Sequence, residues 1–493
     1  MTATLPFAST AAVPDDIALI EAERGIAVTY GELENRVGEA ASAIRRTCGS
    51  DAIVACEPSR TVADVVWYLG AMASGNAVLL VDPNASPVRK EQLYARFRPR
   101  LRPAGPASAG PAVTRSAVAG PASAGLAVAG QAQLIASGAT PAPHPELALL
   151  LSTSGSTASP KLVRLSKDAV TSNAVAIADA LAIEPTARAV ANLPLTSAYG
   201  LSILHSHLAA GATTVLVGRS IAERGFWECV REFRCSSIPG VPAMYQALVR
   251  LRLLDRLGPV RTLTQAGGRL DDATASELRA HARSSGRQVV VMYGLTEATA
   301  RVTVLPPSEF EGRPGSVGRP IQGKLWIAPD NDPIPDGSIP DGTIPDGTEG
   351  LGEIGYEGRN VMLGYATKAE DIAAPDELGA RLMTGDIGRL DSDGYLYVAG
   401  RRSRYAKVDG NRLNLDEVET AVARFGAIRA VEIDGTVALA CARDDIDPGL
   451  VGEVMADLFG LPRRSWLMRE VEAIPLTGNG KVDYAALTRA VSA

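Results

Sequence analysis

The sequence predicts an α/β fold, with a large amino-terminal domain of mainly parallel sheets covered by helices and a small α+β domain at the carboxy-terminus. The chain has 493 residues, more than one hydrophobic core usually serves. Short β-branched runs alternate with helical patterns, as in parallel sheets that are covered on both faces. A charged, glycine-punctuated stretch at residues 400–414 precedes a short tail. We therefore expect one domain over residues 1–400 and a second over residues 401–493.

The large domain is expected to contain buried strands joined by helices. Leu33, Val37 and Ile44 recur at helical spacing and predict an early amphipathic helix. The most apolar long window, residues 65–81, is interrupted by Gly70 and is short for a membrane span. It predicts a buried helix followed by a buried strand. The predicted strands are residues 51–57, 76–82, 212–218 and 287–294.

The remaining stretches are turn-rich insertions and the tail. Residues 105–130 are rich in Ala, Gly and Pro, and residues 334–347 repeat IPDG three times, so both predict surface insertions. The tail predicts a helix at 415–425, two short strands within 427–442, a helix at about 448–459 and a terminal loop.

Composition limits the classes of function. The net charge is -6 and no basic block stands out, which argues against binding of nucleic acid. The five cysteines are scattered without Cys-x-x-Cys spacing, which argues against a disulfide framework or a zinc site. The first residues lack a basic leader before an apolar stretch, so we expect a cytoplasmic protein that does not enter a membrane.

The sharpest local motif is LLLSTSGSTASPKLVRLS, in which an apolar strand leads into small hydroxyl residues and glycine. Such a loop lets backbone N–H and hydroxyl groups approach a polyphosphate, and Lys161 supplies positive charge. A P-loop would need Gly and a hydroxyl residue on either side of the lysine, where Pro160 and Leu162 stand. The motif alone is equally typical of a flexible linker. Its candidate phosphate ligands are Thr153, Ser154, Gly155, Ser156, Thr157 and Lys161.

Three further segments carry possible chemistry. In VVVMYGLTEATAR a buried strand ends at Tyr293 and Gly294, where an aromatic ring, a hydroxyl and the Glu297 carboxylate suit a nucleotide and magnesium. In MTGDIGRLDSDGYLYVAGR, Asp386 is expected in a turn before a hairpin that leads to Arg401. Each has an ordinary structural explanation as well, a capped strand–turn–helix in the first case and a hairpin in the second.

The fourth segment is PLTGNGKVD, which places Lys481 in a glycine loop near the carboxy-terminus. Isolated lysines of this kind are usually exposed to solvent. Motifs typical of α/β-hydrolases, dinucleotide oxidoreductases and zinc proteases are missing from the sequence.

Together these segments resemble the adenylate-forming superfamily of acyl- and aryl-CoA synthetases, adenylation domains and luciferases. The phosphate loop, YGLTE, TGD, the GR hinge region, GNRLNLDEVE and PLTGNGK occur in the family's order, from about Thr29 to Lys481. A chance match to one motif is easy, whereas a match to six in order is not.

The resemblance implies a nucleotide site. The loop from Thr153 to Lys161 is expected to hold the β- and γ-phosphates of ATP. Thr296 and Glu297 would contact the α-phosphate and Mg²⁺, with Glu297 as the metal ligand. The remaining expected nucleotide contacts are Gly268, Arg269, Tyr293, Gly294, Asp386 on the ribose hydroxyls, and Arg401.

The resemblance also implies an acid pocket and a mobile carboxy-terminal domain. Lys481 would offset the repulsion between the acid and the triphosphate and is the expected catalytic residue, with Thr296 and Glu297. After rotation of the small domain, a second face would admit the pantetheine thiol of coenzyme A or of a carrier protein, near Lys407, Gly410 and Arg412. The expected acid-pocket residues are Ser197, Tyr199, Gly200, His205, Gly267 and Leu295.

The chain departs from the family pattern in ways that affect substrate and rate. Ser403 stands at the usual charged hinge position, and Leu162 replaces a glycine after the loop lysine. Ser197 stands where a histidine or aromatic residue is common, which predicts a bulky or unusual acid. Residues 192–211 contain no Asp to pair with an ammonium, so an α-amino acid is disfavoured.

The sequence therefore predicts an ATP-dependent acid–thiol ligase that forms an acyl-AMP and then a thioester with coenzyme A. Two alternatives stay open: a ligase that loads a carrier protein, and a non-catalytic nucleotide-binding relative.

Overall fold

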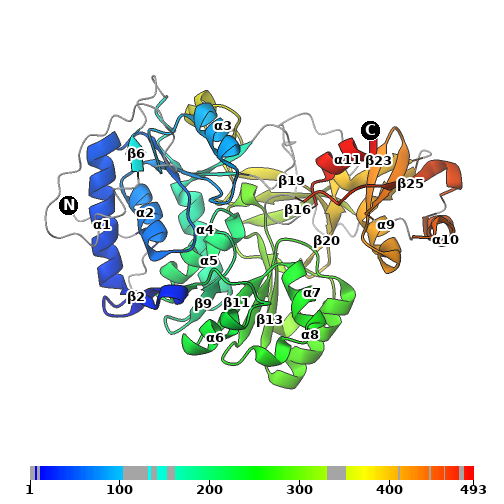
Figure 1. Cartoon of the computed structure of the whole chain (residues 1–493), viewed down its shortest axis with the longest axis horizontal. Helices are drawn as coiled ribbons and strands as arrows, with labels where there is room; N and C mark the ends of the chain where they lie inside the picture. The colour runs from blue at the N-terminus through cyan, green and yellow to red at the C-terminus, as the bar shows by residue number, and fades with distance from the viewer. Residues whose placement is uncertain are drawn as a thin grey trace.

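The computed structural model describes residues 6–7, 12–103, 132–134, 141–152, 161–329, 351–408, 411–442, 446–459, 461–476 and 482–492. A large body carries a smaller unit at one end, and the yellow strands of a four-stranded sheet within residues 324–401 lie between them (Figure 1). The two insertions predicted at residues 105–130 and 334–347 lie outside the described residues.

The large body contains two mixed sheets that are parallel at their centres and antiparallel at their edges. One runs, in spatial order, β15 (Arg319–Pro320), β14 (Thr303–Leu305), β13 (Gln288–Tyr293), β12 (Thr262–Gln265), β11 (Ser237–Gly240), β9 (Arg188–Ala191), β10 (Thr213–Leu216), β1 (Ile17–Glu21) and β2 (Ile26–Thr29). The other runs β18 (Gly364–Ala366), β8 (Leu162–Ser166), β7 (Leu147–Ser152), β4 (Ala77–Leu80), β3 (Ile53–Cys56), β5 (Leu101–Pro103) and β6 (Ala132–Leu134). The four strands expected from the sequence are β3, β4, β10 and β13, so the α/β prediction is confirmed.

Helices cover these sheets and fill the space between them. The predicted first helix is α1, where Thr29 and Glu32 form a reciprocal capping box and Leu33, Val37 and Ile44 are buried. In the centre, α4 contacts β7 and β8 while α5 contacts β9 and β10, so this pair joins the two sheets (Figure 1). The helices of the large body are α1 (Tyr30–Cys48), α2 (Val62–Ala73), α3 (Pro87–Phe97), α4 (Lys167–Ala180), α5 (Ala198–Ala209), α6 (Arg224–Glu232), α7 (Pro242–Arg250) and α8 (Asp272–Ser285).

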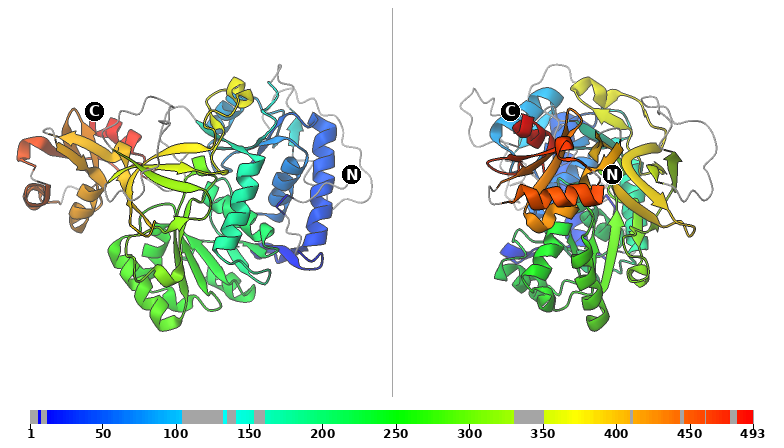
Figure 2. Two further views of the ribbon diagram at one scale, coloured as in Figure 1. Left: turned by 180° about the vertical axis from the view of Figure 1, so that it is seen from behind. Right: turned by 90° about the vertical axis from the view of Figure 1, so that its right-hand side faces the viewer.

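A third sheet is antiparallel and lies against the first (Figure 2). Its strands are β16 (Lys324–Pro329), β17 (Gly352–Glu357), β19 (Arg381–Leu390) and β20 (Leu396–Arg401). The Thr-Gly-Asp segment expected as a turn lies inside β19, where Asp386 pairs with Arg401 in the ladder, and the chain reverses at residues 391–395, within the expected hairpin. The expected hairpin itself is present.

The smaller unit has a hydrophobic core drawn from its own residues. Two buried clusters use only residues from 406 onward, with Val418, Leu439 and Trp466 in one and Leu487 in the other. This supports the proposed division near residue 400. Its elements are β21 (Tyr405–Val408), β22 (Asn411–Asn414), α9 (Leu415–Val422), β23 (Ile428–Ile433), β24 (Thr436–Cys441), α10 (Pro448–Phe459), β25 (Trp466–Glu470) and α11 (Tyr484–Ser492).

The end of the chain differs from the expected terminal loop. After α10, the strand β25 adds in parallel to β24, and α11 buries Leu487 and Val491 against β23.

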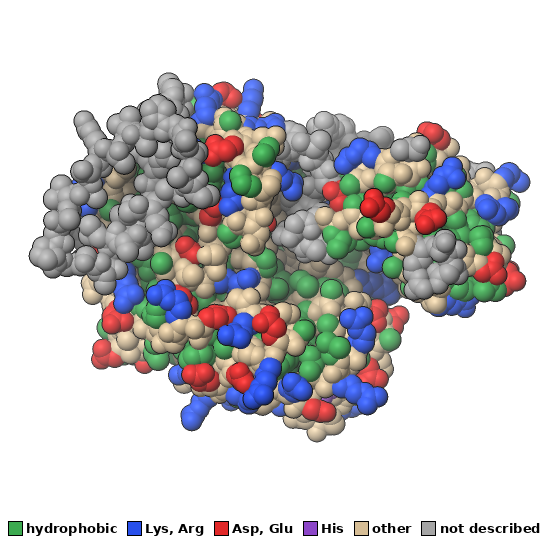
Figure 3. All heavy atoms as spheres, viewed as in Figure 1, with side chains coloured by type: hydrophobic (Ala, Val, Ile, Leu, Met, Phe, Trp, Pro, Cys, Tyr) green, Lys and Arg blue, Asp and Glu red, His purple; other side chains and the backbone are tan. Residues whose placement is uncertain are grey.

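On the face drawn in Figure 3, basic and acidic side chains are interspersed. None of the described helices is both long and apolar enough to span a membrane.

Candidate functional site

The candidate site lies where β12 and β13 end. These parallel strands run in register from Thr262 and Gln288, and each is followed at its carboxyl end by a predicted motif. Gly267 and Gly268 follow β12, and Gly294 follows β13. Loops at this edge of a parallel sheet are the usual place for ligands in open α/β folds.

Tyr293, Asp386 and Arg401 form a polar cluster there. The Tyr293 hydroxyl donates to Asp386 Oδ2 at 2.6 Å, and Arg401 Nε lies 2.8 Å from Oδ1. The Asp386 side chain is only 5% exposed, whereas that of Arg401 is 58% exposed. Burial raises the pKa of the Asp386 carboxyl, and the charge of Arg401 opposes that rise. All three residues were predicted from the sequence as nucleotide contacts, and the fold brings them together.

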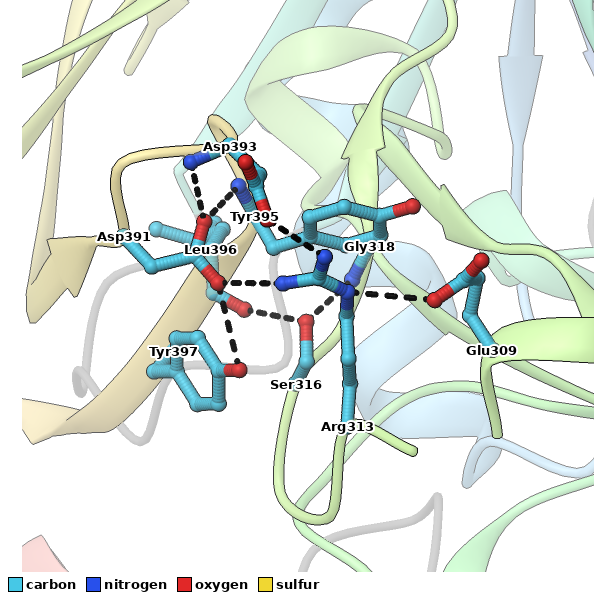
Figure 4. A network of polar contacts seen from close by, with 9 residues as sticks. All are labelled: Glu309, Arg313, Ser316, Gly318, Asp391, Asp393, Tyr395, Leu396 and Tyr397. Carbon is cyan, nitrogen blue, oxygen red and sulfur yellow. Dashed lines mark hydrogen bonds and ion pairs between the residues drawn. The ribbon is translucent and has the colours of Figure 1, made fainter. Parts of the chain in front are cut away.

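A second network joins the antiparallel sheet to the connection between β14 and β15, and β14 in turn pairs with β13, which carries Tyr293. Arg313 reaches Asp391 at 2.8 Å and Asp393 at 2.6 Å, and its guanidinium lies over the Tyr395 ring (Figure 4). Beside it, backbone hydrogen bonds join Val317 and Gly318 to Leu396. These contacts tie the β14–β15 connection to the β19–β20 turn, so Asp386 and Tyr293 are held in a fixed relation.

The turn after β13 is tightly packed. Thr296–Ala298 form a single helical turn (η4), not the start of a longer helix, because Thr299 and Ala300 adopt positive φ and end it. Gly294 faces the returning chain so closely that a Cβ there would lie 1.7 Å from the Ala300 carbonyl oxygen. Glycine is therefore required at this position for the turn to form.

Glu297 is linked to Lys161 through a tyrosine. The Tyr365 hydroxyl, on β18, donates to Glu297 Oε1 at 2.9 Å, and Lys161 Nζ lies 3.4 Å from the centre of the Tyr365 ring. Two candidate residues far apart in the sequence thus converge on one side chain that the motifs did not identify. Tyr365 lies 68 residues after Glu297 and belongs to no family motif that we recognised, so no local signal pointed to it.

Ser197 and Gly200 shape the start of α5. Ser197 caps the helix, accepting from the Gly200 N–H at 3.0 Å and donating to the Pro194 carbonyl at 2.8 Å. This gives the serine a structural role in addition to the space it was expected to leave. Tyr199 donates to the Thr264 carbonyl at 2.8 Å, so its ring lies beside β12.

Two of the expected acid-pocket residues lie in the interior. His205 stacks on Phe7 with ring centres 4.1 Å apart and meets the Tyr68 hydroxyl at 2.7 Å, and Leu295 belongs to the main hydrophobic cluster. The cavity that Tyr199 lines contains His207 and not His205. His205 lines a neighbouring cavity with Leu201 and Ser202, so its expected contact with the acid stays a prediction.

The other predicted site residues differ in how much of them the structure describes. Gly267 has φ of +86°, which lets the chain turn sharply after β12, and Arg269 is 66% exposed near Asp272. Lys407 and Arg412 are register partners on β21 and β22, and their side chains lie outside what the structure describes. Outside the described residues altogether lie Thr153, Ser154, Gly155, Ser156, Thr157, Gly410 and Lys481.

One more residue was not singled out by the sequence. Arg301 is 2% exposed and its guanidinium lies 4.6 Å from the centre of the Tyr199 ring. Arg301 is the last residue of the YGLTEATAR segment. A charged residue in a stretch expected to be buried was the sequence signal that could have identified it.

Comparisons with known proteins identify the family of the chain. A family model described as AMP-binding enzyme matches residues 7–366. A PKS-NRPS hybrid synthetase of Aspergillus candidus is 27% identical over 93% of this chain, which spans only 19% of that protein. Sulfoacetate–CoA ligase of Cupriavidus necator is 28% identical, covering 85% of this chain and 82% of the ligase.

A solved structure supports the same fold. ATP-bound MatB from Rhodopseudomonas palustris superimposes with a TM-score of 0.74 at 21% identity, covering 97% of this chain and 96% of that one. The family model spans well over half of the chain, and the sequence motifs follow the family's order. The chain therefore belongs to the AMP-binding enzyme family, within the adenylate-forming superfamily.

Proposed function

We propose that this protein is an ATP-dependent acid–thiol ligase. The acid's carboxylate oxygen attacks the α-phosphorus of ATP, which forms acyl-AMP and releases pyrophosphate. A thiol sulfur then attacks the acyl carbon, the thiol proton is lost, and AMP leaves to give the thioester. The observation that carries the proposal is the Tyr293–Asp386–Arg401 cluster beside the Thr296–Glu297 turn, at the ligand-binding edge of the sheet.

In this proposal Asp386 receives the ribose hydroxyls. Its carboxylate is held in place by Tyr293 and Arg401, so it is ordered before the nucleotide arrives. A carboxylate that accepts hydroxyl hydrogen bonds in a shielded place gives charge-assisted bonds, which are stronger than neutral ones. Arg401, more than half exposed, remains available to the phosphate side of the nucleotide.

Glu297 is proposed to bind the Mg²⁺ ion that accompanies ATP. Its carboxylate oxygen is a hard donor of the kind Mg²⁺ prefers, and one carboxylate suits an ion held mainly by phosphate oxygens and water. When bound, Mg²⁺ would neutralise phosphate charge. The Tyr365 hydroxyl orients the Glu297 carboxylate, while Lys161 at the Tyr365 ring adds positive charge on the same side.

Lys481 is proposed to act in the first half-reaction only. Two anions, the acid and the α-phosphate, must approach each other, and an ammonium offsets their repulsion as the new bond forms. The small unit would then turn to present the face that includes Lys407, Gly410 and Arg412 to the thiol arm. We take coenzyme A as the acceptor, because a relative matched over most of its length is named a CoA ligase.

The first experiment is acid-dependent exchange of labelled pyrophosphate into ATP, with a broad panel of carboxylic acids. The proposal predicts exchange with at least one acid and none without acid, and predicts that Asp386→Ala weakens it through a higher KM for ATP. Absence of exchange with every acid, together with normal ATP binding, would support the non-catalytic alternative.

A second experiment separates the half-reactions. Lys481→Ala should lose exchange but keep thioester formation from supplied acyl-AMP, whereas Lys167→Ala, an exposed lysine at the start of α4, should lose neither. Equal loss of both half-reactions in Lys481→Ala would contradict the assigned role. Supplying free coenzyme A in parallel with a phosphopantetheinylated carrier protein identifies the acceptor.

A further inference from the structure

Arg301 is a buried cation without an anionic partner among the described residues. Its Nε atom has no hydrogen-bond partner, and its Nη2 atom reaches only the Ser202 hydroxyl at 3.4 Å. The face of the Tyr199 ring supplies the remaining polar contact. A guanidinium has five N–H donors, so most of its capacity is unused. Burial lowers the pKa of Arg301, which reflects the cost of keeping this charge away from water.

Another buried arginine shows how the fold satisfies such a group when its role is structural. Arg164, on β8, is 0% exposed and pairs with Glu377 at 2.7 Å. It also donates to the carbonyls of Leu363, Ala374 and Pro375. Buried charges are normally paired in this way, because an unpaired one is costly. The Nε atom of Arg164 lacks a hydrogen-bond partner as that of Arg301 does, but Arg301 also lacks an anionic partner among the described residues, and this difference needs an explanation.

Arg301 lines a partly open cavity whose walls are both polar and apolar. The cavity has a volume of about 90 Å³ and lies between α4, α5 and the strands β9, β11, β12 and β13. Tyr199, Ser202, Ser206 and Thr264 contribute hydroxyls to its lining. Burial lowers the pKa of His207 to about 4, so that ring is neutral at physiological pH. Arg301 is thus the single formal charge among the described lining residues.

The cavity extends along the strands, from Ser237 and Thr262 at the amino ends of β11 and β12 toward the edge that carries the site described above. Thr264 and Met292 line it near the carboxyl ends of β12 and β13. Tyr293 follows Met292 and, because side chains alternate along a strand, points to the other face, toward Asp386. An acid whose reacting carboxylate lies at this edge of the sheet would extend its remaining atoms into the cavity.

We infer that the acid substrate is short, in contrast to the bulky acid expected from Ser197, and carries a second anionic group, a carboxylate or a sulfonate, which binds Arg301. This rests on the proposed function and specifies its substrate class. One such group supplies the oxygens that the guanidinium lacks, in the paired geometry that arginine favours. The cavity volume of about 90 Å³ corresponds to about six to nine water-sized positions of about 10–15 Å³ each, which limits the length of the acid beyond the reacting carboxylate. The same cation repels an ammonium, in keeping with the lack of an Asp between residues 192 and 211.

The test compares acids that differ only in the distal group. Pyrophosphate exchange is measured with succinate against butyrate, glutarate against valerate, and sulfopropionate against butyrate. The wild-type chain should prefer the doubly anionic member by about 10- to 100-fold in kcat/KM, as expected for hydrogen bonds to a charged group. Arg301→Met should lose that preference and accept the mono-acids at least as well. A wild-type preference for mono-acids, or a preference retained in Arg301→Met, overturns the inference while leaving the ligase function intact.

A stability measurement is independent of turnover. Arg301→Met should unfold at the same temperature as wild type or higher without ligand, because it removes an uncompensated buried charge. Arg164→Met is the matched control and should unfold at a lower temperature, because Glu377 and three carbonyls lose their donor. Millimolar diacid should stabilise wild type and not Arg301→Met. If no acid supports exchange, the proposed function fails. Equal or absent stabilisation of wild type and Arg301→Met by the diacids would still reject the inference, and selective stabilisation would still support it.

Discussion

Replacing Gly294 by alanine should damage catalysis more than stability. The added Cβ would lie 1.7 Å from the Ala300 carbonyl oxygen and 3.0 Å from the Arg301 Cα, so the two chain segments must separate by more than about 1 Å. Thr296 and Glu297 lie between these segments and would move with them. Displacements of about 1 Å at a reacting centre can cost about 100-fold in rate, whereas overpacking costs about 1–3 kcal/mol of stability.

The control is Gly38→Ala in the interior of α1, where the added Cβ meets no atom within 4 Å. It should stabilise the protein by about 0.5–1 kcal/mol, because alanine favours a helix over glycine, and should leave the rate unchanged. Pyrophosphate exchange measures the rate, and unfolding in urea measures stability. A Gly294→Ala variant that exchanges pyrophosphate at the wild-type rate would refute the reasoning that the turn positions the reacting groups.

Three other changes test separate parts of the molecule. Asp386→Asn should raise the KM for ATP about 10- to 100-fold, measured by AMP formation. Because burial raises the pKa of Asp386, the wild-type KM should rise as pH falls through that raised value while the Asn variant shows no such step; a parallel response would contradict the assignment. Tyr365→Phe should lower kcat about 3- to 10-fold by freeing the Glu297 carboxylate, with unaltered kcat as the contrary result. Arg404→Leu should destabilise the small unit by about 1.5–3 kcal/mol in urea unfolding, because Glu419 loses the nearer of its two cations and keeps only Arg429 at 3.7 Å; a loss below about 1 kcal/mol would show that the pair is dispensable.

The sequence predicted best where the signal was local. The runs that became β3, β4 and β13 are continuous, β-branched and bounded by turn residues, so no tertiary information was needed to find them. The same holds for α1 with its capping box. Helix α11 was missed although Leu487 and Val491 are spaced for a helix, because the glycine loop before it drew the interpretation toward a terminal loop.

Pairing between strands far apart in the sequence limited how much of the site could be predicted. Asp386 and Arg401 were each identified, but Asp386 was expected in a turn, and the ladder between β19 and β20 overrode that local turn chemistry. The contact of Tyr365 with Glu297 depends on β18 lying beside β8, which no motif encodes. The lack of an anionic partner for Arg301 among the described residues could be recognised only from its burial and its neighbours in the fold.

The most direct test of the central claim, that the acid is activated as acyl-AMP, measures the transfer of a labelled oxygen from the acid to AMP. The acid identified by the exchange panel is prepared with heavy-isotope oxygens in its carboxylate and converted to thioester with ATP and coenzyme A. If the carboxylate attacks the α-phosphorus, one labelled oxygen must appear in AMP and none in pyrophosphate, as read by mass spectrometry. Unlabelled AMP, with the heavy oxygen in phosphate or pyrophosphate, would show that the acid is activated at another phosphorus and would contradict the acyl-AMP mechanism.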